Sequence, residues 1–145
     1  MTRPVRSVLM LMVALVLFTM PLSAEMAPEV YEQMKSSAPE QLEVRVRSVQ
    51  VRAYLLTRAR DVTVKAEILA VTRSETMLSD GDGITIRYES YNPPKRGWAG
   101  PRPIPIVKKG EETVAFLQWD AALRCYVPAA RGASFEPLQT YWVQR

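Results

Sequence analysis

Histidine is absent from this 145-residue chain, and cysteine occurs once, at Cys125. Without histidine, the usual zinc sites, Ser-His-Asp triads and Cys-His dyads cannot be assembled. A lone cysteine cannot form an intramolecular disulfide, and the apolar neighbours in "LRCYVP" predict a buried structural thiol. Acid–base chemistry by Asp, Glu, Lys or Tyr remains open, but no spacing singles out such a pair. We therefore expect a protein that is not an enzyme, with no catalytic residue, no metal site and no cofactor.

A strong excess of one charge is also lacking once the N-terminus is set aside. The formal net charge is +4, and residues 1–24 contribute two arginines and no acid, so the remainder carries +2. Phosphate binding needs a concentrated basic face, and the sequence contains no such block. Nucleic acid is therefore not expected as a partner.

The N-terminal segment "MTRPVRSVLMLMVALVLFTMPLSA" has a cationic start, an apolar run and a small-residue end. Arg3 and Arg6 precede the apolar run over residues 8–22, which ends in Leu22-Ser23-Ala24. This pattern predicts a secretory signal peptide over residues 1–24, cleaved after Ala24. A retained membrane anchor is the alternative, but the run is shorter than the roughly 20 residues that a spanning helix needs. We expect an exported protein, periplasmic or extracellular, with no stable membrane anchor after cleavage.

The rest of the chain is long enough for one domain with a modest core. The segment "EMAPEVYEQMKSSAPEQ" predicts a short helix from Pro28 to about Lys35, with Val30, Tyr31 and Met34 on its apolar side. Residues 25–41 are thus an N-terminal helix and linker, either packed as a cap or frayed, and residues 42–145 form a β domain.

Alternation with a period of two begins at Leu42 and predicts a long strand whose phase slips by one residue at Ser48, as a bulge would cause. After the slip, the apolar positions continue on odd numbers as far as Leu55. Further strands are predicted in "DVTVKAEILAV" (61–71), "ITIRYESY" (84–91) and "EETVAFLQW" (111–119), and shorter ones in "RCYVPA" (124–129) and "TYWVQ" (140–144).

Five or six strands with slipped phases favour closure, because closure removes exposed edges and bulges supply curvature. The predicted fold is mainly β: a small five- or six-stranded antiparallel OB-like barrel with a short N-terminal helix. A β-sandwich is the alternative.

Three segments carry a resemblance to known families: "VTVKAEILAVTRS", "GDGITIRY" and "GEETVAFLQ". In this order they resemble the OB barrels of netrin-like, tissue-inhibitor-of-metalloproteinase type. The segments "GWAGPRPIP" (97–105) and "YVPAARGASF" (126–135) resemble those of small uncharacterised bacterial exported proteins. The resemblance covers about residues 60 to 135 and implies an OB barrel that binds through one face and its long loops. Metalloproteinase inhibitors of this type use an N-terminal cysteine on zinc, which this chain lacks, so that mechanism is not implied.

The proline-rich loop "YNPPKRGWAGPRPIPIV", from Tyr91 to Val107, is too long for a minimal hairpin. Its prolines restrict the backbone, and glycines flank Trp98 on both sides. In one interpretation Trp98 is a plug over an open end of the barrel. In the other, Tyr91, Arg96, Trp98 and Arg102 form an aromatic and cationic surface for an anionic or peptide ligand.

The small residues of "YVPAARGASFEPL" permit close backbone approach, which favours a tight crossing packed under the proline-rich loop. The functional alternative adds Arg131 to Arg96 and Arg102 in gripping a carboxylate or phosphate. The expected function is a non-enzymatic module that uses the loop face around Trp98 to bind a protein or envelope component. The alternative is a small-ligand carrier whose barrel is capped by this loop.

Overall fold

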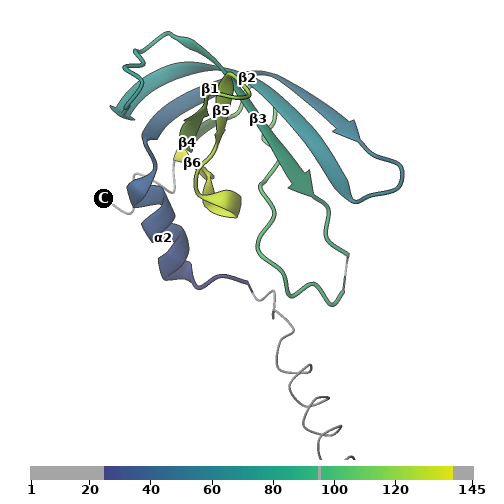
Figure 1. Cartoon of the computed structure of the whole chain (residues 1–145). Coiled ribbons are helices and arrows are strands. Elements are labelled where there is room, and N and C mark those ends of the chain that lie inside the picture. Colours follow the sequence, from purple (N-terminus) through teal and green to yellow (C-terminus); the bar gives the residue numbers. More distant parts are fainter. Residues whose placement is uncertain (1–24, 95, 139–145) are drawn as a thin grey trace, which may run out of the picture.

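The computed structural model of the chain describes residues 25–94 and 96–138 (Figure 1). The elements are, in chain order, α2 (Pro28–Ser37), β1 (Glu40–Ala53), β2 (Ala59–Arg73), β3 (Gly83–Tyr91), β4 (Glu112–Asp120), β5 (Cys125–Pro128), the 3-10 helix η1 (Arg131–Ala133) and β6 (Phe135–Pro137). The expected short strand at 140–144 lies outside the described residues.

The strands form a closed five-stranded barrel with one strand outside it. The sheet runs in the order β1-β2-β3-β5-β4, and β1 also pairs with β4, which closes the ring, while β6 pairs with β4 from outside. All pairings are antiparallel except that between β3 and β5, which are parallel at Ile86 and Tyr126. The predicted small OB-like barrel is thus confirmed, in place of the sandwich alternative.

The expected bulge in β1 is present. The register between β1 and β2 shifts between Val46 and Ser48. Up to Val46, β1 pairs with β2 on one side and with β4 on the other, and beyond the bulge it pairs with β2 alone. The bulge therefore lies where β1 leaves β4 and the closed ring, and β1 continues outward on β2, which is paired with β3 on its other side.

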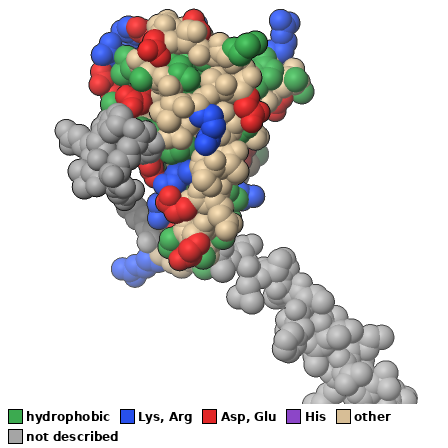
Figure 2. All heavy atoms as spheres, turned by 90° about the vertical axis from the view of Figure 1, so that its left-hand side faces the viewer, with side chains coloured by type: hydrophobic (Ala, Val, Ile, Leu, Met, Phe, Trp, Pro, Cys, Tyr) green, Lys and Arg blue, Asp and Glu red, His purple; other side chains and the backbone are tan. Residues whose placement is uncertain are grey.

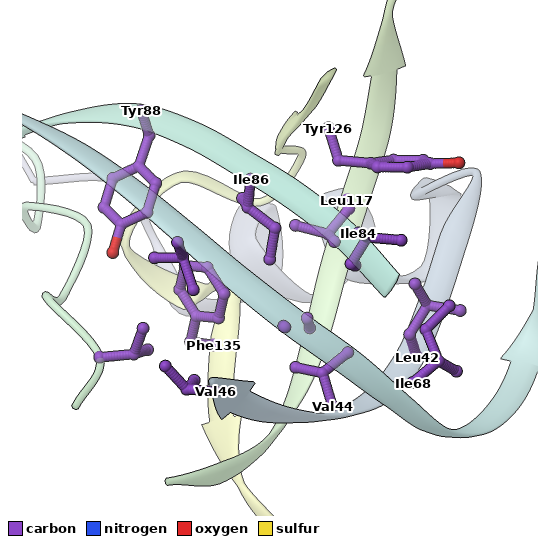
Figure 3. Close-up of a cluster of buried hydrophobic side chains, with 14 of the residues drawn as sticks. Leu42, Val44, Val46, Ile68, Ile84, Ile86, Tyr88, Leu117, Tyr126 and Phe135 are labelled. Carbon is purple, nitrogen blue, oxygen red and sulfur yellow. The ribbon is translucent and has the colours of Figure 1, made fainter. Parts of the chain in front are cut away.

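The alternating apolar residues of the strands fill the barrel. The side chains on these inward positions are almost completely buried, and Figure 3 shows them converging from different strands. Tyr88 and Phe135 lie side by side at one end, with ring centroids 5.7 Å apart. The cluster comprises Leu42, Val44, Val46, Val62, Val64, Ala66, Ile68, Ile84, Ile86, Tyr88, Val107, Ala115, Leu117, Tyr126 and Phe135.

A second, smaller core lies outside the barrel, beneath α2. Ala115 and Leu117 of β4 face the barrel, whereas Val114 and Phe116 face outward and are covered by Tyr31 and the segment around Ala130 and Ala133. The helix is therefore a packed cap rather than a frayed arm. It extends to Ser37, two residues beyond the predicted end.

Some strand boundaries differ from the sequence prediction, and one strand was not expected. β1 ends at Ala53, so Leu55 lies in the turn after the strand rather than on its apolar side. The strand β6 was not expected, because it has three residues and only its pairing with β4 defines it.

Candidate binding site at the proline-rich loop

The proline-rich loop is attached to the barrel at both ends. At its start, the Asn92 N–H donates to the carbonyl of Arg58 at 2.9 Å. At its end, the Ser90 hydroxyl donates to the carbonyl of Ile104 at 2.6 Å, and the Tyr88 hydroxyl donates to that of Pro105 at 2.9 Å. Ile104, Ile106 and Val107 also pack against the barrel core. The second half of the loop is thus part of the folded body, and the first half projects from it (Figure 1).

Trp98 packs on its own loop and stays partly in solvent. Its ring lies 5.0 Å from that of Tyr91 between centroids, and its indole N–H donates to the Pro101 carbonyl at 3.3 Å. A Cβ atom at Gly100 would lie 2.3 Å from the indole, so only glycine permits this ring position. Trp98 remains 41% exposed and belongs to neither core cluster. Residues 104–107, rather than Trp98, close against the barrel core.

The Arg102 side chain lies against α2. Its guanidinium stands 5.6 Å from the ring centre of Tyr31, and its Nε is 3.8 Å from a carboxylate oxygen of Glu25. The Arg102 backbone N–H donates to the Tyr31 hydroxyl at 3.3 Å. Tyr31 therefore holds the middle of the loop through both a hydrogen bond and a cation–π contact.

Arg131 lies on η1, which packs against the segment that carries Arg102. A Cβ atom at Gly132 would lie 2.5 Å from the Arg102 carbonyl oxygen. The Ala130 N–H donates to the Ser134 hydroxyl at 2.9 Å, which fixes this tight turn. The expected crossing of small residues under the proline-rich loop is confirmed, while the Arg131 side chain remains exposed.

Four of the five predicted site residues therefore fall into two groups. Tyr91 and Trp98 form one pair of tilted rings in contact, and Arg102 and Arg131 lie on neighbouring segments beside α2. Arg96 is exposed, and in the described residues no hydrogen bond, ion pair or ring contact joins it to the others.

A cavity of about 450 Å³ lies beside the second group, between α2, Arg102 and the residues around η1. Lys35 borders it, buried, with its ammonium 2.6 Å from Glu32 and 2.5 Å from Glu136. Burial opposes the charged form of Lys35, but the hydrogen bonds to these two carboxylates outweigh it and raise its pKa above the usual 10.5. The positive charge of Lys35 is thus already balanced by two carboxylates of the protein, and the ion pair with Glu136 joins α2 to β6.

Sequence reasoning did not identify Tyr31 and Lys35 as neighbours of the site. Tyr31 was expected only on the apolar side of the helix, and its contact with Arg102 depends on how the helix packs. The pattern contained one usable signal, since Lys35 follows Tyr31 by four positions and therefore lies on the same side of a helix.

Charges of both signs are mixed on the visible described part of the face in Figure 2. The described residues contain no cluster of three or more Cys, Asp or Glu side chains that could bind a metal ion. Within residues 25–94 and 96–138, no helix has the length and apolar character needed to cross a membrane. No protein-family model, curated protein or solved structure matches this chain.

Proposed function

We propose that the protein is an exported, non-enzymatic binding module. Its partner is a protein or another envelope component, and the contact surface is the loop face formed by Tyr91, Arg96, Trp98 and Arg102, with Arg131 beside it. The observation that supports this proposal is the half-exposed Trp98 ring, held in place by Tyr91, Gly100 and Pro101.

An aromatic ring that is already fixed is well suited to binding. Tryptophan is enriched among the residues that dominate interface energies, and fixing a side chain before association reduces the entropy lost in the complex. The hydrogen bond to Pro101 and the contact with Tyr91 restrict the Trp98 ring in the free protein. A partner therefore meets a ring whose position is largely determined before contact.

The cations of this face determine which partners suit it. Arg96 is exposed, and the side chain of Arg102 is 61% exposed although it contacts Tyr31 and Glu25. Guanidinium groups bind carboxylates with two parallel hydrogen bonds. We therefore expect a partner segment that combines an apolar or aromatic group with an acidic side chain.

The interior of the barrel favours this function over a small-ligand carrier. The inward side chains of the five strands occupy the space that a carried ligand would need. Val44, Val64, Ile86 and Leu117, which come from four different strands, have no measurable exposure.

The test is capture of partners from the cell-envelope extract of the source organism, followed by direct binding to the purified partner. We expect a specific protein to bind the wild type and to bind W98A at least tenfold more weakly by calorimetry, because the anchor of the interface is removed.

The matched control is W119A. Trp119 is 46% exposed and packs against Tyr126 at 5.0 Å between ring centroids, so it resembles Trp98 in exposure and in its tyrosine neighbour but lies on β4. Equal affinity of W98A and wild type, with both variants folded, would exclude the loop face as the binding surface.

A further inference from the structure

The hairpin of β1 and β2 carries two fully exposed leucines at its tip. β1 ends at Ala53 and β2 begins at Ala59, and the turn between them lies at the edge of the molecule away from α2 (Figure 1). Leu55 and Leu56 are 105% and 99% exposed, as open to solvent as in an extended chain. Tyr54, which precedes them, and Val51 in β1 are about half exposed.

Such a pair differs from ordinary surface leucines. Single exposed apolar residues are common on soluble proteins, whereas contiguous exposed apolar groups mark contact surfaces. Here two adjacent leucines occupy a turn. Polar residues would form the same turn without exposing apolar side chains to water. Together with Tyr54 they border an open hollow beside Asp61 and Glu89.

Arginines surround this apolar tip. Residues 52–60 contain three arginines, Arg52, Arg58 and Arg60, and no acid. Among the described residues, none of the three forms an ion pair. Asp61 is the cross-strand partner of Arg52, and Glu89 is that of Asp61. Asp61 accepts the hydrogen bond of the Tyr54 hydroxyl.

We propose that this hairpin tip binds the surface of an anionic lipid bilayer. Leu55 and Leu56 enter the boundary between headgroups and acyl chains, and Arg52, Arg58 and Arg60 contact lipid phosphates. The apolar side chains lie at the tip and the cations lie just behind them. In an anionic bilayer the acyl chains likewise lie beneath the phosphates, so each kind of side chain meets the layer that suits it. Long arginine side chains reach the phosphates while the backbone stays above them.

A bilayer suits this surface better than a second copy of the chain. Stable protein interfaces bury at least about 1,200 Å² in total, and a narrow turn with two leucines offers much less. A bilayer needs no matching surface, because it adapts to an inserted side chain. The proposal uses residues outside the loop face and does not depend on the function proposed above.

The test is co-sedimentation with vesicles, either of phosphatidylglycerol and phosphatidylethanolamine or of phosphatidylcholine alone. The protein is produced from the full chain, and its N-terminus is identified by mass spectrometry so that every variant is compared with the same ends. We expect the wild type to bind the anionic vesicles, and L55S/L56S to bind them at least tenfold more weakly. R52Q/R58Q is expected to weaken binding and to reduce its dependence on salt.

The control is M77S, because Met77 is 88% exposed and lies beyond the opposite end of β2 from the tip. M77S should bind vesicles like the wild type. Equal binding of wild type to neutral and anionic vesicles, or wild-type binding by L55S/L56S, would overturn the proposal. A further result would also overturn it: the wild type does not bind vesicles but forms a dimer in sedimentation velocity, and the dimer is lost in L55S/L56S. The hairpin tip would then bind a second copy of the chain.

Discussion

Tyr88 joins the barrel core to the proline-rich loop. Its ring packs against Phe135 inside the barrel, and its hydroxyl donates to the carbonyl of Pro105. Burial raises the pKa of Tyr88 to about 12, against an opposing contribution from a backbone contact at Val107. The folded state therefore keeps the proton of this hydroxyl at pH values where an unfolded tyrosine, with a pKa near 10, loses it.

This difference predicts a loss of stability at high pH. Between pH 10 and about 12 the folded chain binds more protons at Tyr88 than the unfolded chain, so the free energy of unfolding falls as pH rises. The contribution of Tyr88 is complete below pH 10 and decreases by about 2 kcal/mol near pH 11.5.

Urea unfolding of wild type and Y88F at several pH values measures this effect. At pH 8, Y88F should be less stable by about 1 kcal/mol, because the hydrogen bond to Pro105 is lost. Near pH 11.5 we expect the order to reverse, since phenylalanine has no proton to lose. A stability difference that stays constant with pH would contradict the raised pKa.

At the scale of elements, η1 and the proline-rich loop are in backbone contact. A Cβ atom at Gly132 would lie 2.5 Å from the Arg102 carbonyl oxygen, and backbone cannot move aside as a flexible side chain can. We expect G132A to lower the free energy of unfolding by about 1–3 kcal/mol through overpacking.

G83A is the matched control, because a Cβ atom at Gly83 meets nothing within 4 Å. Its stability should stay within about 0.5 kcal/mol of the wild type. Urea unfolding of both variants measures these changes in the free energy of unfolding. If G132A lowered stability no more than G83A, η1 and the loop could separate at little cost.

The elements also show how far the sequence predicts this fold. Alternation identified most strands correctly, because the barrel buries one side of each, as Val62, Val64 and Ile86 illustrate. It extended β1 to Leu55, because a local pattern cannot show that the hairpin leaves the ring and that nothing covers its tip. The burial of Lys35 was equally out of reach, since the carboxylate of Glu136 comes from a distant strand.

The candidate site was predicted less completely. The sequence identified a loop with an exposed arginine and a tryptophan, and the structure places Tyr91 against Trp98. Spacing along the chain could not show that Arg102 would contact Tyr31 of α2. Such contacts depend on tertiary packing. The sequence of a loop has no repeating pattern from which that packing could be predicted.

At the scale of the whole molecule, the ring is closed by strands that are far apart in the chain. β1, β2 and β3 follow one another as hairpins, whereas the pairing of β1 with β4 brings Glu40 beside Leu117. Pairing two strands that are neighbours in the chain closes a short loop and loses little chain entropy. Pairing β1 with β4 closes a long loop and loses more.

This closure has a kinetic consequence: the three-stranded meander should form before the ring closes, so folding should be slow for a domain of this size. Stopped-flow measurements on I68A and L117A test the order. Ile68 pairs with Val44 in the hairpin, and Leu117 lies in the closing strand β4. I68A should slow folding, with a φ-value of about 0.5 or more, and L117A should mainly speed unfolding, with a φ-value below about 0.3. The reverse order would mean that the two ends of the ring find each other first, and that the pairing of β1 with β2 forms later.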